Sequence, residues 1–139
     1  MSEAWRGILL AVAAAGILMV LFHHAVVRIY KARDWLARGA ILVDVDTASE
    51  FADHHPRIAV SLPLELLVEH AGSIGERNSR IVVFAHSWWR GSKAARELRR
   101  LGFVDVFNAA GVHTKEELSM AAARAAPSVD TEIELSRGR

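Results

Sequence analysis

Few side chains in this sequence could take part in covalent chemistry. The 139 residues contain no cysteine, which excludes disulfides, thiolate metal sites and any mechanism that needs a sulfur nucleophile from this chain. His86 and Ser87 place a histidine base beside a serine nucleophile, the pair that many hydrolases use. Neighbours in a tight loop rarely align in this way, and the sequence shows no third group that would orient the histidine. We therefore do not expect a hydrolase.

Seven histidines raise the question of a metal site. His54 and His55 are adjacent, as are His23 and His24, and adjacent helical positions point about 100° apart. The sequence lacks two ligands spaced for one helical face together with a carboxylate. The formal charge is +1, with 17 basic and 16 acidic residues, which gives no basic footprint for nucleic acid. We expect no metal, no cofactor and no nucleic-acid partner.

Two adjacent tryptophans, Trp88 and Trp89, follow this histidine and serine. An exposed tryptophan supplies the large, stiff, amphipathic area that binding sites favour. A tryptophan that folds inward would instead fill a pocket. The sequence leaves both interpretations open, and one tryptophan could serve each purpose.

The elements that must position these residues alternate between strands and helices. Apolar runs predict strands at 40–45, 59–62, 80–86 and 104–107. Apolar periodicity and capping residues predict helices at 26–38, 47–54, 63–71, 90–101 and 114–126. This alternation implies an α/β fold, a doubly wound and mostly parallel sheet covered by helices on both faces.

The amino-terminal segment is apolar enough to cross a membrane. Residues 7–22 carry no charge, and a helix over residues 8–27 would be about 30 Å long, the thickness of a bilayer core. Trp5 and Tyr30 flank it at interfacial positions. A cleaved signal peptide would have a more basic start than Arg6 alone and a small-residue cleavage site. We favour a retained anchor over a signal peptide or a core helix.

The basic residues beside this segment predict its orientation. Arg28, Lys31, Arg33 and Arg38 follow the span, whereas Arg6 alone precedes it. Basic flanks stay preferentially in the cytoplasm, so we predict a single-pass protein of the cell membrane with a cytoplasmic soluble part. The predicted organisation is a tail and anchor over 1–28, a globular domain over 29–126, and a flexible polar tail over 127–139.

Several motifs in the soluble part resemble the rhodanese-like family in their order and spacing. ILVDVDTASEF at 41–51 is similar to the family's strand that ends in Asp-x-Arg and leads into a helix. HHPRIAVSLPL at 54–64 resembles the next family segment, with His55, Ala59 and Pro63 in register. VVFAHSWWRGSKAARELRRLGF at 82–103 resembles the active-site strand, loop and helix, and NAAGV at 108–112 falls at the family's closing turn.

The resemblance implies an active-site loop that has lost its sulfur acceptor. In active relatives the loop begins with a cysteine that carries a persulfide, followed after four residues by an arginine. Ala85 occupies the cysteine position, and Arg90 matches the arginine. A methyl group has no lone pair with which to accept sulfur, so we expect an inactive homologue and not an enzyme. Asp44 and His55 also match family positions, and we expect them to hydrogen-bond loops together.

The resemblance also implies an oxyanion cradle made by backbone N–H groups of this loop and the next helix. Trp88 stands where the family commonly has glycine, and a bulky side chain disfavours positive φ and takes up substrate space. Asp46 replaces the usual arginine, and its charge weakens attraction for thiosulfate or phosphate. We expect a reshaped cradle.

These features predict a non-catalytic interaction module held at the membrane, as an accessory subunit of a membrane complex. The altered loop would contact a protein partner through Ala85, His86, Ser87, Trp88, Trp89, Arg90 and Gly91. Two alternatives stay open. One is a sensor of oxyanions or sulfur species, in which loop amides and Arg90 hold a small anion. The other is a sulfurtransferase that uses a cysteine from another chain.

Overall fold

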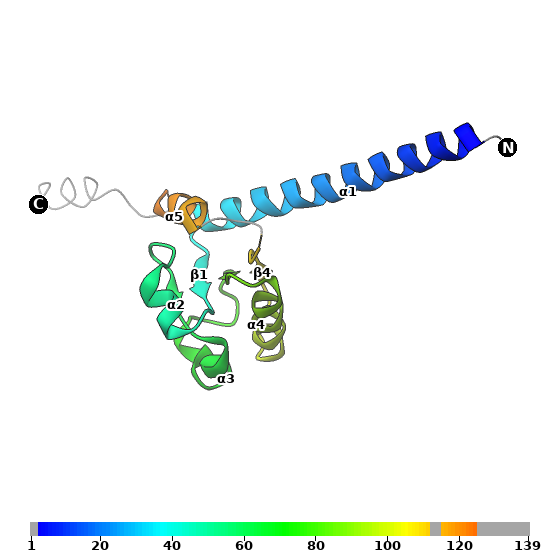
Figure 1. Cartoon of the computed structure of the whole chain (residues 1–139). Coiled ribbons are helices and arrows are strands. Elements are labelled where there is room, and N and C mark those ends of the chain that lie inside the picture. The colour runs from blue at the N-terminus through cyan, green and yellow to red at the C-terminus, as the bar shows by residue number, and fades with distance from the viewer. Residues whose placement is uncertain (1–2, 112–114, 125–139) are drawn as a thin grey trace, which may run out of the picture.

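Within the part of the chain that the structure describes, the sheet has four strands, all parallel. The computed structural model describes residues 3–111 and 115–124, and Figure 1 shows the sheet with a long helix leaving it. The strands lie in the order β2-β1-β3-β4. Their bounds are Ile41–Asp44 for β1, Val60–Ser61 for β2, Ile81–Phe84 for β3 and Val106–Asn108 for β4. This sheet confirms the predicted α/β class.

The two central strands are apolar because both of their faces are covered. All four residues of β3 are buried, and in β1 only Ile41 is partly exposed. Val43 pairs with Val83 across the centre, and Val83 pairs in turn with Asn108. A strand between two helical layers has no solvent face to carry polar residues, which explains the continuous apolar runs in the sequence.

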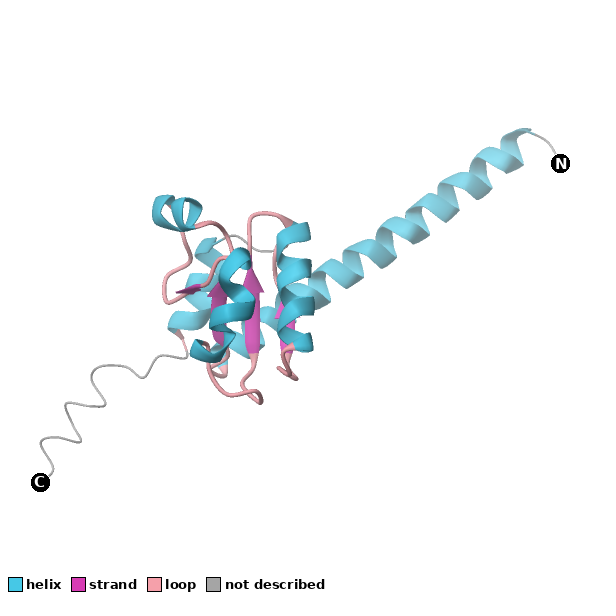
Figure 2. Cartoon of the chain, turned by 90° about the horizontal axis from the view of Figure 1, so that it is seen from below, coloured by secondary structure: helices cyan, strands magenta, loops and turns pink. Residues whose placement is uncertain are grey.

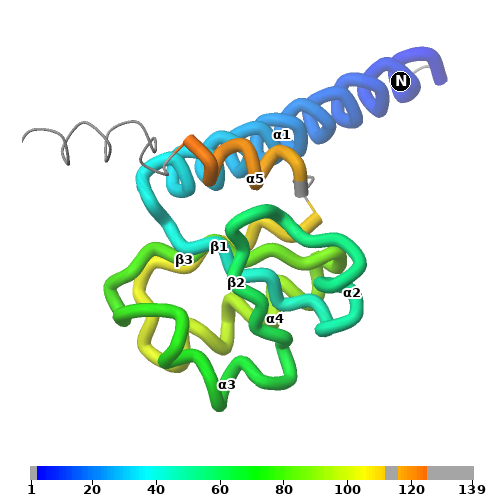
Figure 3. Tube along the Cα trace, turned by 90° about the vertical axis from the view of Figure 1, so that its left-hand side faces the viewer, coloured from blue at the N-terminus to red at the C-terminus, as the bar shows by residue number. Residues whose placement is uncertain are grey.

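One face of the sheet is covered by α1 (Glu3–Ala37) and α5 (Lys115–Ala123). Figure 3 shows both helices together on one side of the strands. Leu42 and Phe84 point toward this layer, because alternate residues of a strand face opposite ways. The buried cluster on this face consists of Ala32, Leu36, Leu42, Val82, Phe84, Ala109, Leu118 and Ala121.

The other face is covered by α3 (Leu67–His70) and α4 (Trp88–Arg100), as Figure 2 shows from below. Its buried cluster includes Val43, Val45, Val83, Leu67, Ala94 and Leu98. The helix predicted over 63–71 is instead a short α3 between two 3-10 turns, η1 (Leu64–Leu66) and η2 (Ala71–Ser73). The apolar pattern located this segment correctly but predicted too regular a helix.

The remaining helix, α2 (Ala48–Asp53), begins with a capping box. The Thr47 hydroxyl accepts from the Glu50 backbone N–H, and the Glu50 carboxylate accepts from the Thr47 backbone N–H at 2.8 Å. Hydrogen bonds from the Thr47 hydroxyl, and then from its backbone N–H, hold the pKa of Glu50 below the ordinary value of 4.5. The helix predicted over 47–54 is therefore present and one residue shorter at each end, and of its two candidate caps, Asp46 and Thr47, the structure uses Thr47.

Helix α1 joins the apolar segment to the domain without a break. It is long and apolar enough to cross a membrane by length and composition, and no residue of its most apolar stretch is buried. Its last turns pack on the sheet through Ala32 and Leu36. Arg33 also pairs with Glu117 of α5 at 3.0 Å. The helix predicted over 26–38 is therefore the end of this longer helix. The two ends of the helix predicted over 114–126, and the tail predicted over 127–139, lie outside the described residues.

Candidate functional site

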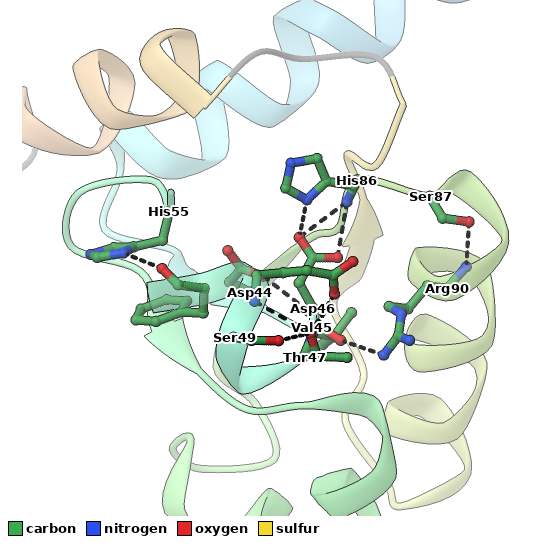
Figure 4. Close-up of polar contacts among 11 residues, drawn as sticks. Asp44, Val45, Asp46, Thr47, Ser49, His55, His86, Ser87 and Arg90 are labelled. Carbon is green, nitrogen blue, oxygen red and sulfur yellow. Dashed lines mark hydrogen bonds and ion pairs between the residues drawn. The ribbon is translucent and has the colours of Figure 1, made fainter. Parts of the chain in front are cut away.

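The candidate site lies where β1 and β3 end. The chain leaves β1 toward β2 on one side, and β3 lies on the other, so the strand order reverses between β1 and β3. Ligands of parallel sheets bind at the carboxyl ends of the strands at such a reversal. The segments 45–47 and 85–87 meet here, as Figure 4 shows. The sheet thus brings together most of the predicted site residues.

Ala85 follows β3 directly and is only 1% exposed. Its methyl group belongs to the buried cluster with Val45, Val83 and Ala110. The position that the sequence marks as the missing sulfur acceptor is therefore part of the hydrophobic core. The side chain offers no polar atom there.

Asp46 and His86 tie the two loops together. The Asp46 side chain is 2% exposed, and its two carboxylate oxygens accept from the backbone N–H of His86 at 3.1 and 3.2 Å. The ring Nδ1 of His86 also lies 2.6 Å from Asp46 Oδ2. A buried carboxylate needs such partners, and this one has three contacts to one residue. The sequence singled out both residues but not their contact, since they lie 40 positions apart.

The pairing of Asp46 with His86 supplies one of the two contacts that a hydrolytic triad requires. Asp46 is the group that orients His86, which the sequence did not reveal. The Ser87 hydroxyl, however, caps α4 by accepting from the backbone N–H of Arg90 at 3.5 Å. Within the described residues no hydrogen bond joins Ser87 to the His86 ring, so the geometry is not that of a hydrolytic triad.

Arg90 is already paired within the chain. Its Nη1 lies 3.1 Å from Glu65 Oε1 and 3.4 Å from the Val45 carbonyl oxygen. Glu65 comes from η1, a contact that no local pattern in the sequence indicates. A carboxylate beside the guanidinium offsets the positive charge that a small anion would need. This arrangement disfavours anion binding at Arg90.

The loop predicted over 85–91 is shorter than expected. Helix α4 begins at Trp88, two residues before the predicted start, because the Ser87 cap begins the helix there. The expected conflict between Trp88 and a positive φ does not arise, because Trp88 is helical. Of the non-glycine residues that the structure describes, only Ile58 has a positive φ. The first turn of α4 takes the place of an open loop.

Gly91 lies where α4 approaches the end of β4 most closely. It is buried, and a Cβ at this position would overlap Ala110 Cβ and the Asn108 side-chain oxygen. Asn108 uses that oxygen to accept from the Ala110 backbone N–H at 2.9 Å. Only glycine allows this approach without displacing its neighbours.

Trp88 and Trp89 both point outward. Their exposed fractions are 58% and 62%, so neither fills a buried pocket. The Lys93 ammonium lies 5.4 Å from the centre of the Trp89 ring. Trp88 lies against Gly111. A Cβ added to Gly111 would lie 3.3 Å from the Cβ of Trp88. Of the two interpretations that the sequence left open, the structure favours the exposed one.

Asp44 and His55 take part in local hydrogen bonds. Asp44 Oδ1 accepts from the Asp46 backbone N–H at 3.0 Å and so shapes the turn after β1. His55 Nδ1 contacts the Phe51 carbonyl oxygen at 2.7 Å, and its ring stacks on the Phe51 ring at 4.0 Å. Over residues 3–111 and 115–124, no three histidine or acidic side chains gather as a metal site would require.

Comparison with known proteins gives one consistent result. The family model described as the rhodanese-like domain matches residues 29–112. A crystal structure of a rhodanese-like domain from Anabaena sp. is 32% identical, with a TM-score of 0.50, over 52% of this chain and 84% of that one. Another X-ray structure of the rhodanese-like domain of that protein is 30% identical, with a TM-score of 0.48, over 63% and 78%. No curated protein matches.

Proposed function

The chain belongs to the rhodanese-like domain family, and because it has no cysteine we propose that it is a catalytically inactive member that serves as an interaction module at a membrane. The observation that carries this proposal is the buried methyl group of Ala85 at the position of the family's sulfur acceptor. A persulfide cannot form on that side chain. The domain keeps the family fold without the group that performs its chemistry.

The anchor is the second part of the proposal. Helix α1 has the length and the composition of a membrane span, and the apolar side chains of its first part have no cover within the described chain. Restriction to a membrane raises the local concentration of a domain toward partners in the same membrane, so a weak contact is sufficient. We propose that the protein is an accessory subunit of a membrane complex.

The surface proposed for this contact is the altered site and the first turn of α4. Trp88 and Trp89 stand exposed there, and tryptophan is enriched among the residues that dominate binding energy. The charged groups beside them, Asp46 and Arg90, are already paired inside the chain. This surface is better suited to binding a protein partner than to catalysing a reaction.

Purification from the native membrane in mild detergent tests the proposal. We expect a defined set of chains to co-purify with the wild-type protein and to be lost from the double variant Trp88→Ala/Trp89→Ala. The matched control is Leu66→Ala/Val68→Ala, which removes two exposed apolar side chains from η1 and α3. Recovery of the wild type as a lone chain, or equal recovery of partners with both double variants, would contradict the proposal.

The alternative of an anion sensor has less support. Glu65 and the Val45 carbonyl occupy Arg90, and Asp46 adds negative charge on the other side of the site. A sulfurtransferase that borrows a partner's cysteine is also disfavoured, because the Ala85 position is buried. Calorimetric titration with thiosulfate, sulfate and phosphate separates the sensor from the interaction module, which predicts no saturable heat.

A further inference from the structure

The exposed tryptophans at the start of α4, Trp88 and Trp89, lie close to the point where α1 leaves the domain. Figures 1 and 2 show α4 on the side of the domain from which the amino-terminal part of α1 extends. Trp88 and Trp89 form the first two positions of α4. Two exposed indole rings therefore lie on the same side of the domain as the apolar part of α1.

A short series of contacts connects the end of the apolar segment to these tryptophans. Arg28, the first charged residue after that segment, donates from Nη2 to the Asn108 carbonyl oxygen at 2.8 Å. Asn108 packs tightly against Gly91 in the first turn of α4, and Gly111 lies against Trp88. These contacts place the first turn of α4 beside the part of α1 that carries Arg28.

The chemistry of this surface fits the boundary between lipid and water. Tryptophan is enriched at membrane interfaces, where its ring meets the acyl region and its N–H remains hydrated. Lys93 stands over the Trp89 ring, and Arg28 lies at the end of the proposed span. Both cations suit the phosphates of lipid headgroups, because basic residues near an anionic surface are attracted to it.

We propose that Trp88 and Trp89 insert into the headgroup region of the bilayer beside α1, with Lys93 directed toward lipid phosphate. This inference rests on the proposed function, because it requires α1 to span the membrane. It assigns the two tryptophans to lipid instead of to direct contact with the protein partner, so the former active-site edge of the domain makes a second membrane contact, and Trp88→Ala/Trp89→Ala loses its partners because the domain loses its orientation on the bilayer. The domain then has one fixed orientation on the bilayer, and a protein partner meets it at the membrane surface.

Depth-dependent fluorescence quenching in vesicles tests this contact with the full chain. The chain has four tryptophans, so Trp5→Phe/Trp35→Phe leaves only Trp88 and Trp89 to emit. In phosphatidylcholine vesicles that contain lipid brominated near the headgroup, we expect a blue-shifted emission and about a twofold loss of intensity. The control is Trp5→Phe/Trp88→Phe/Trp89→Phe, which keeps half-buried Trp35 on the sheet side of α1, and we expect it to keep its intensity.

Lys93 provides an independent measurement. Replacing part of the phosphatidylcholine with phosphatidylglycerol should increase the quenching of Trp88 and Trp89, and Lys93→Gln should reduce that increase. Quenching that is indifferent to the anionic lipid and to Lys93→Gln would overturn the role given to Lys93.

Extraction with alkaline carbonate distinguishes failure of this inference from failure of the anchor. If the chain stays with the vesicles but brominated lipid does not quench Trp88 and Trp89, the lipid contact is overturned while the anchor stands. A chain that is released by carbonate overturns both. Loss of co-purifying chains on Trp88→Ala/Trp89→Ala, without any lipid quenching, would assign the tryptophans to a protein surface instead.

Discussion

At the scale of single residues, the candidate site is closed by pairs within the chain. Asp46 is satisfied by His86, and Arg90 by Glu65 and the Val45 carbonyl oxygen. Ala85, between these pairs, contributes only a buried methyl group. A site that binds an anion through side chains needs an unpaired positive charge, and among the described residues of this site the Arg90 guanidinium is already paired with Glu65.

We predict that Ala85→Cys restores almost no sulfur transfer from thiosulfate to cyanide. The new thiol would lie in the core cluster, and the nearby Asp46 carboxylate disfavours the thiolate. A thiol reagent should react slowly with this variant, and faster with Ser87→Cys, whose side chain is exposed in the same loop. Turnover comparable to an active relative would show that the pocket is open.

Asp46 should contribute measurably to stability. We expect Asp46→Ala to lower the free energy of unfolding by about 2 kcal/mol, because the His86 backbone N–H loses its acceptor and a buried space is left. Urea denaturation of the detergent-solubilised chain measures the change. Asp53→Ala, an exposed position at the end of α2, should change stability little. Equal losses of unfolding free energy in the two variants would show that Asp46 contributes no more to stability than Asp53.

At the scale of elements, the close approach of α4 to β4 decides the shape of the site. Ser87 starts the helix early, and Gly91 allows its first turn to lie against Asn108 and Ala110. The helix turn therefore occupies residues that would otherwise form an open loop. The same turn carries Trp88 and Trp89 to the surface.

Gly91→Ala should destabilise the domain by about 2 kcal/mol, because the added methyl overlaps Ala110 and Asn108. The matched control is Gly72→Ala, where a Cβ meets nothing within 4 Å and φ is not in the left-handed region. Thermal unfolding followed by circular dichroism compares the two variants. If Gly91→Ala is as stable as Gly72→Ala, then α4 does not approach β4 as closely as described.

At the scale of the whole molecule, one helix combines an exposed apolar part with a part that packs on the domain. The first part of α1 is apolar and exposed, whereas its last turns form part of the domain through Ala32, Leu36 and Arg33. No flexible linker separates the two parts, because the helix runs from Glu3 to Ala37 without interruption. A membrane span built in this way transmits its orientation directly to the domain.

The basic residues after the apolar stretch predict that the domain faces the cytoplasm. Because the chain lacks cysteine, single cysteines can report this orientation without background. In intact cells, a membrane-impermeant maleimide should label Glu3→Cys and should label Ser49→Cys, in α2, only after the membrane is permeabilised. Labelling of Ser49→Cys in intact cells would reverse the predicted topology.

The sequence by itself determined the fold class, the strands, the presence of helix α2 and the absence of any cysteine. The structural features among these are local, because they depend on apolar periodicity and on capping residues. Such patterns need no knowledge of what lies across the sheet. The sequence also marked α1 as a candidate span from its length and composition.

Only the tertiary structure decided how the site is closed. Asp46 meets His86, Glu65 meets Arg90, and Arg28 meets Asn108 across separations of 40, 25 and 80 residues. No periodicity encodes such contacts, because they depend on which strands lie side by side and where each loop ends. The exposure of Trp88 and Trp89 likewise follows from the early start of α4 and from its close packing at Gly91.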